Sequence, residues 1–87
     1  MRDVFHQIIH FDAGSRSKFH KHSCDQILAI VEGTVKIASD TEVLTVTEGD
    51  VGLIPAGENH WHGAPDDTSM AHIYILAADD KPEQTEP

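Results

Sequence analysis

Two pairs of histidines, each with one residue between its members, give this sequence its clearest capacity for chemistry. His20 and His22 form the first pair and are followed by Gln26; His60 and His62 form the second pair about forty residues later. Side chains alternate between the two faces of a β-strand, so residues two apart point the same way. Imidazoles from two such pairs can surround one divalent metal, and the pattern does not choose among Mn, Fe, Co, Ni, Cu and Zn.

The segments that carry these histidines belong to a chain with strand patterns and turn signals and no helical period. Seven runs are rich in strand-forming residues or alternate apolar and polar residues: 4–11, 25–33, 34–39, 42–50, 51–55, 60–64 and 70–77. Gly33 and Gly49 stand where the chain must reverse, and Pro55–Gly57 predicts a tight turn that delivers His60. Seven or eight short strands at this spacing predict an all-β sandwich or barrel.

Length, charge and cysteine content narrow the class of protein. The 87 residues are enough for one domain, which we place at residues 1–77, and the acidic, proline-containing segment 78–87 is expected to be a flexible tail. A formal net charge of −9 argues against nucleic acid and anionic membrane surfaces as partners. With the single cysteine, Cys24, and no apolar run long enough to span a bilayer, we expect a cytoplasmic protein.

The spacing around the first histidine pair is similar to a known family motif. Gly14 is followed after five residues by His20 and His22, then after three residues by Gln26, and after six more by Gly33. This arrangement resembles the first motif of the cupins, with glutamine in the place of the usual glutamate.

The spacing around the second pair resembles the second cupin motif. Gly49 is followed after five residues by Pro55–Gly57 and after two more by His60, and Ala64 stands where the family motif ends in asparagine. The resemblance covers Phe11 to Leu76, with both motifs in the family's order. It implies a small antiparallel jelly-roll β-barrel, commonly a homodimer, with one metal inside the barrel.

By this resemblance the metal ligands are His20, His22, Gln26 and His60. A narrower resemblance is to the cupins related to carboxymuconolactone-decarboxylase-associated proteins, a group that includes bacterial cupin-type hydroxynitrile lyases and holds manganese or a similar ion with histidine, histidine, glutamine and histidine. The cofactor is therefore expected to be Mn, Fe, Ni or Zn, with Mn favoured. An alternative is that Gln26 only forms hydrogen bonds inside the barrel.

The neutral glutamine indicates the kind of chemistry to expect. Three imidazoles and an amide leave the charge of a dication uncompensated, which strengthens its action as a Lewis acid and weakens its retention. Two histidines with one carboxylate are the usual iron arrangement for oxygen activation, and this donor set lacks the carboxylate. We therefore expect a metal-dependent lyase acting on a small hydroxyl or carbonyl compound; a dioxygenase and a non-enzymatic metabolite-binding protein are the alternatives.

Three further residues have side chains that could act near the metal. His62 shares the parity of His60 and is a candidate proton carrier, or alternatively a histidine that only forms hydrogen bonds. His72 is a second acid–base candidate by resemblance to the lyase group, although a lone histidine on an apolar strand is commonly a packing residue. Cys24 has the parity of His22 and Gln26 but matches no ligand of the family.

Overall fold

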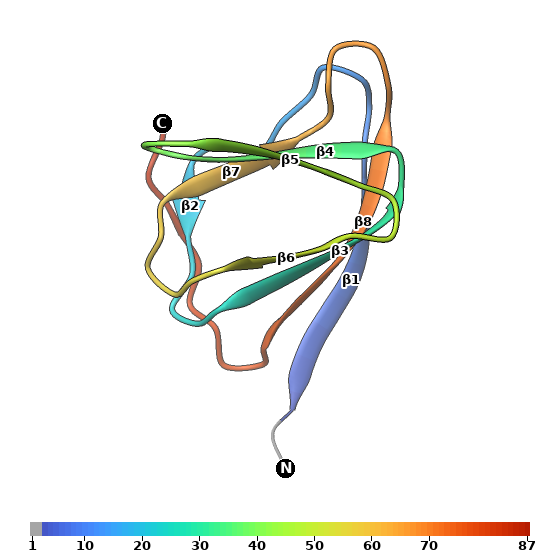
Figure 1. Cartoon of the computed structure of the whole chain (residues 1–87). Helices are drawn as coiled ribbons and strands as arrows, with labels where there is room; N and C mark the ends of the chain where they lie inside the picture. The colour runs from blue at the N-terminus through green and yellow to red at the C-terminus, as the bar shows by residue number, and fades with distance from the viewer. Residues whose placement is uncertain (1–2) are drawn as a thin grey trace.

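Nine β-strands form the regular secondary structure of residues 3–87, the part of the chain described by the computed structural model (Figure 1). They are β1 (Val4–Phe11), β2 (His20–Lys21), β3 (Gln26–Glu32), β4 (Thr34–Ser39), β5 (Val43–Thr47), β6 (Val51–Ile54), β7 (His60–Gly63), β8 (Met70–Ala77) and β9 (Glu83–Gln84). Residues 3–87 contain no α-helix, and hence no helix able to cross a membrane. The predicted all-β class is confirmed.

The strands form two antiparallel sheets that face each other (Figure 1). One sheet has the order β1-β8-β3-β6, and the other has the order β5-β4-β7-β2-β9. Except for β4 and β5, neighbours in each sheet are distant in sequence, as when β1 pairs with β8 along its whole length. This arrangement is the predicted jelly-roll barrel.

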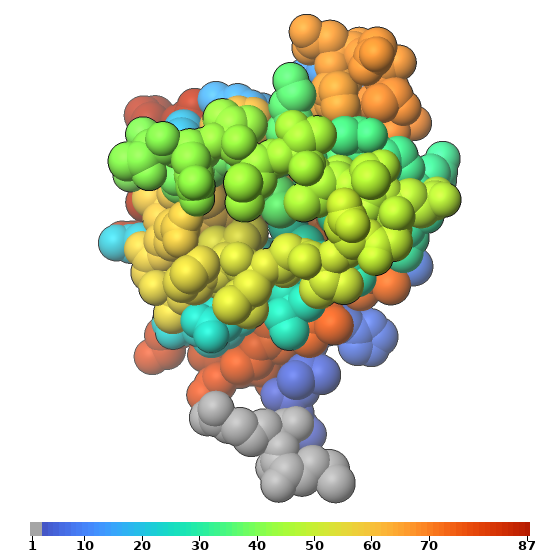
Figure 2. All heavy atoms as spheres, viewed as in Figure 1, coloured from blue at the N-terminus to red at the C-terminus, as the bar shows by residue number. Residues whose placement is uncertain are grey.

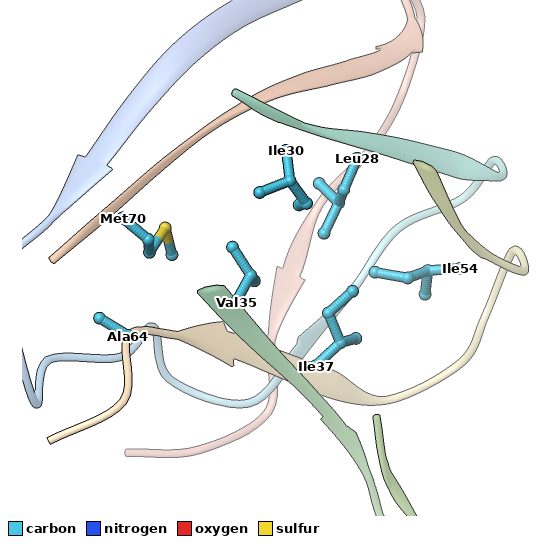
Figure 3. Close-up of a cluster of buried hydrophobic side chains, with 7 residues drawn as sticks. All are labelled: Leu28, Ile30, Val35, Ile37, Ile54, Ala64 and Met70. Atoms are coloured by element: carbon cyan, nitrogen blue, oxygen red, sulfur yellow. The ribbon is translucent and has the colours of Figure 1, made fainter. Parts of the chain in front are cut away.

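The apolar core fills the space between the sheets and is shown in Figure 3. Alternate residues of β3 and β4 point inward, so that Leu28 and Ile30 meet Val35 and Ile37. Figure 2 shows the segments of β5 and β6, edge strands of different sheets, on the face turned toward the viewer. Inward positions elsewhere carry polar side chains: Gln26 on β3, His60 and His62 on β7, and His72 on β8, all buried.

Two turns predicted from glycine have the expected backbone conformation. Gly33, between β3 and β4, has φ +75°, and Gly49 has φ +91°. The turn Pro55–Gly57 precedes β7, and its Gly57 amide donates to the carbonyl oxygen of His22 at 2.9 Å. This turn therefore braces the first histidine pair as well as leading to the second.

The C-terminal segment 78–87, whose composition predicts a flexible tail, makes defined contacts with the barrel. Its strand β9 pairs with β2, so that Gln84 lies opposite His20 and Glu83 opposite Lys21. The carboxylate of Glu86 forms two hydrogen bonds with the Arg16 guanidinium, at 3.1 and 3.2 Å. The edge of β2 and the side chain of Arg16 thus bind a segment whose local composition predicts only exposure to solvent.

Candidate metal centre

Three strands and the loop after β2 bring the predicted ligands together inside the barrel. His20 on β2 lies opposite His60 on β7, and their ring centroids are 4.4 Å apart. The ring of His22 is 5.1 Å from that of His20. Gln26, the first residue of β3, is 3% exposed and places its Oε1 atom 3.1 Å from Nε2 of His60.

Backbone carbonyls fix the protonated nitrogen of two of these rings. Nδ1 of His20 donates to the carbonyl oxygen of Lys18 at 2.6 Å, and Nδ1 of His60 donates to that of Glu58 at 2.9 Å. A neutral imidazole carries one N–H, so each Nε2 atom is left with a lone pair. Both rings therefore present an acceptor to the interior.

The contact between His60 and Gln26 brings two acceptors together. Burial lowers the pKa of His60 to about 4, although its hydrogen bond to the Glu58 carbonyl opposes the shift. The ring is therefore neutral at pH 7, and its Nε2 lone pair faces the amide oxygen of Gln26 without a hydrogen between them. A cation bound by both atoms accounts for this geometry, because metal ligands converge through their lone pairs.

The donor atoms of three histidines already lie at the separation of a metal site. One nitrogen from each of His20, His60 and His62 lies within 4.8 Å of the others. Burial lowers the pKa of His20 and His62, so both are neutral and available as ligands near pH 7. The Nε2 atom of His22 is also buried and has no hydrogen-bond partner among residues 3–87. These residues fit a divalent transition metal.

The position of His62 relative to the other histidines is defined by the structure and not by sequence parity. His62, predicted as a proton carrier, has a donor atom in the same group as those of His20 and His60. Its Nδ1 atom is also 3.3 Å from Nε2 of His72, which is fully buried. His62 therefore connects the candidate metal centre to His72.

Comparison with known proteins establishes the family. The family described as "Cupin domain" (Cupin_2) matches residues 7–76. The chain belongs to the cupin family. The cupin-like protein of Thermotoga maritima superimposes with a TM-score of 0.91 at 28% identity, over 95% of this chain and 65% of that chain.

One curated relative and one protein of similar fold are named as lyases. The (R)-mandelonitrile lyase of Granulicella tundricola is 35% identical over 66 residues, which are 75% of this chain and 50% of that protein. The chain thus spans half the length of this curated relative. The DMSP lyase DddQ of Ruegeria pomeroyi superimposes with a TM-score of 0.84 at 19% identity. The match covers 98% of this chain and 44% of that chain. This second likeness shows the fold alone.

An apolar cavity adjoins the histidines of this cupin. Its volume is about 530 Å³, and its polar walls include His20, His22, Gln26 and His62. Its apolar walls include Phe5, Ile9 and Phe11 from β1 with Tyr74 and Leu76 from β8. The arrangement places three histidines and a glutamine at one wall of a space sized for a small organic molecule.

Sequence reasoning missed one acidic side chain at this cupin's centre. Asp80 of the C-terminal segment accepts a hydrogen bond from Nδ1 of His22 at 2.7 Å. Burial would raise the pKa of Asp80, but its hydrogen bonds with His22, Cys24 and the Ser23 amide hold the pKa below the usual value. The segment's composition predicted a solvated carboxylate, and no local spacing relates Asp80 to His22.

Cys24 is oriented toward the same carboxylate. Its Sγ atom is 3.4 Å from Oδ1 of Asp80. Burial raises the pKa of the thiol, and the nearby Asp80 carboxylate adds to this effect. Cys24 is therefore a thiol that hydrogen-bonds Asp80, and it does not belong to the group of close metal donors in residues 3–87.

Proposed function

We propose that this cupin is a metal-dependent lyase that cleaves or forms a bond beside the hydroxyl or carbonyl carbon of a small organic compound. The observation that carries the proposal is the convergence of histidine and glutamine lone pairs on the wall of an apolar cavity. The curated relative, a mandelonitrile lyase, supports this form of chemistry. The apolar walls favour a substrate with an apolar or aromatic group.

The metal-binding residues in this proposal are His20, His22, Gln26 and His60. The first and last have tautomers that leave Nε2 free, and His22 has a buried Nε2 without a partner. Manganese is the expected metal, with Fe, Ni and Zn as alternatives. A bound metal supplies a Lewis acid for the substrate's hydroxyl or carbonyl oxygen.

His62 and His72 are proposed to move the proton. Burial lowers the pKa of both histidines, so that each is a neutral base near pH 7. His62 lines the cavity and accepts the proton of the substrate hydroxyl, and the 3.3 Å contact with His72 stabilises the resulting imidazolium. Phe11 packs against both rings and excludes water from this pair.

The test combines metal analysis with an assay for cleavage of mandelonitrile. Protein purified without chelator should contain one divalent transition metal per chain and release benzaldehyde, and His20→Ala should lose both properties. His62→Ala should keep the metal and lose at least a hundredfold in rate. His10→Ala, at an exposed position on β1, is the matched control and should behave as wild type. Equal metal content in wild type and His20→Ala would refute the metal centre.

The same preparation separates the two alternatives. A dioxygenase would consume oxygen with iron bound and would not cleave mandelonitrile anaerobically. A non-enzymatic binding protein would bind small ligands equally well after the metal is removed. Cleavage that persists without oxygen and stops after chelation supports the lyase.

We also propose that the partner of this chain is a second copy of itself, bound through the outer face of the sheet β1-β8-β3-β6. Two rows of paired residues cross that face, namely Ile8, Ile73, Ala29 and Val51, and His6, Ile75, Ile27 and Leu53. Neither row contains Asp, Glu, Lys or Arg, although the chain carries a net charge of −9. Two copies therefore repel each other least where these rows meet. A cytoplasmic location stays a prediction.

A further inference from the structure

We propose that Asp80 is a positioning residue of the metal centre: it fixes the ring of His22 with Nε2 toward the metal and supplies negative charge that Gln26 lacks. The inference rests on the proposed metal centre and adds to it a residue from outside the region that matches the family, residues 7–76. It changes the expectation drawn from the sequence, in which the charge of the dication was uncompensated.

The contact between Asp80 and His22 is short and buried. Oδ2 of Asp80 lies 2.7 Å from Nδ1 of His22, and the two side chains are 7% and 10% exposed. The other carboxylate oxygen, Oδ1, accepts the backbone amide of Ser23 at 2.9 Å and the Cys24 thiol at 3.4 Å. Both oxygens are engaged, so the carboxylate has one fixed orientation.

This orientation determines the chemistry of the His22 ring. A carboxylate acceptor requires the proton on Nδ1, and in the neutral ring that a metal ligand must be, this leaves the Nε2 lone pair for the metal. His20 and His60 achieve the same tautomer with neutral carbonyl oxygens, at 2.6 and 2.9 Å. A carboxylate is the stronger acceptor and raises the basicity of the ligand nitrogen. His22 is thus the ligand through which negative charge reaches the otherwise neutral donor set.

The fold holds Asp80 in place from both sides. Its amide donates to the carbonyl oxygen of Ala77 at the end of β8, and the amide of Lys81 donates to Oγ of Ser23 at 2.9 Å. Further along, β9 pairs with β2, and Glu86 binds Arg16 (Figure 1 shows this segment, in red, beside β2). The segment therefore returns across the first histidine pair with Asp80 aligned on His22.

The experiment compares Asp80→Ala and Asp80→Asn with Asp79→Asn, which makes the same charge change at an exposed neighbouring position. Affinity for Mn²⁺ and Zn²⁺ is measured by calorimetry. The His22 tautomer is measured in metal-free protein by ¹H–¹⁵N NMR of the ring. Asp80→Ala should weaken metal binding about 10–100-fold and reduce the Nδ1–H tautomer of His22. Asp80→Asn should have a metal affinity between those of Asp80→Ala and wild type, and Asp79→Asn should have the affinity and tautomer of wild type.

Glu86→Gln separates the role of Asp80 from a general effect of segment 78–87 packing against β2. This variant weakens the contact with Arg16 and leaves the Asp80–His22 pair intact. The proposal is overturned if Glu86→Gln weakens metal binding as much as Asp80→Ala, or if Asp80→Ala keeps wild-type affinity and tautomer. Wild type without affinity for a divalent metal overturns it as well. Metal affinity that depends on Asp80 in a protein without lyase activity supports Asp80 and refutes only the proposed reaction.

Discussion

Gln26 is the residue at which charge and chemistry of the centre are most directly connected. Its buried amide oxygen lies 3.1 Å from Nε2 of His60. Gln26→Glu places a carboxylate at that position, so we expect metal affinity to rise about tenfold, equivalent to ~1.4 kcal/mol, and lyase turnover to fall as Lewis acidity falls. Calorimetry and steady-state kinetics measure the two effects. Gln7→Glu, at an exposed position on β1, is the control, and a parallel change in both variants would contradict this explanation.

The buried histidines predict how the metal-free protein responds to acid. Burial holds the pKa of His60 at about 4, against 6.5 for the unperturbed group, and lowers the pKa of His20, His62 and His72 in the same direction. Between pH 6.5 and 4 the unfolded chain binds protons that the folded chain does not, so the free energy of unfolding must decrease as pH falls. His60 alone contributes on the order of 3 kcal/mol to this loss.

Urea denaturation of chelator-treated protein measures this acid response. The midpoint should be highest near pH 7 and should decrease through the window from pH 6.5 to 4. His60→Gln removes one of the responsible groups and should give a shallower dependence on pH. A midpoint that is constant across this window would show that the histidines are not neutral and buried in solution.

At the scale of elements, the turn between β3 and β4 depends on one glycine. Gly33 has φ +75°, and a Cβ atom there would lie 2.5 Å from the carbonyl oxygen of Ser69. Gly33→Ala should therefore destabilise the fold by more than the ~1 kcal/mol of backbone strain alone, as measured by the urea midpoint. Gly49→Ala is the control, because φ is +91° but no atom lies within 4 Å of the added Cβ. Equal losses in the two variants would exclude the clash as the cause.

The strands were predictable from sequence where their pattern is local. The runs 4–11, 34–39 and 70–77 coincide with β1, β4 and β8, because alternation and turn residues identify a half-buried strand. β9 was not predictable in this way, because its pairing depends on contacts such as Glu86 with Arg16, 70 residues apart. Local composition describes the solvation of such a segment but not its partners.

The same division applies to the candidate site. His20, His22, Gln26 and His60 lie close together in the structure, and period-two alternation predicts from sequence only that His20 and His22 share a face. Parity does not give the distance between segments, so it did not show that a nitrogen of His62 approaches those of His20 and His60. Nor could it indicate Asp80, whose place depends on the path of the chain after β8.

At the scale of the whole molecule, the two faces of the sheet β1-β8-β3-β6 have different roles. Its inner face contributes Phe5, Ile9 and Phe11 of β1 to the cavity wall. Its outer face leaves large apolar side chains exposed, including Ile8 at 54% and Leu53 at 62%. A dimer formed through the outer face would bury these side chains and keep β1, which carries part of the cavity wall, against a rigid surface.

A charge placed on that face should therefore prevent association. In Leu53→Lys the ammonium group would be desolvated beside the apolar rows of the second copy, so we expect the 9.6 kDa monomer in place of a particle of twice that mass. Sedimentation equilibrium at micromolar concentration measures the mass directly. Leu44→Lys is the matched control, because Leu44 is 52% exposed on β5 of the other sheet, and it should leave the dimer intact. A monomeric wild type, or dissociation by both variants, would contradict the assignment of this face. If monomeric Leu53→Lys keeps the metal content of the wild type, the metal centre is complete within one chain. The close approach of nitrogens from His20, His60 and His62 in a single chain leads to this expectation.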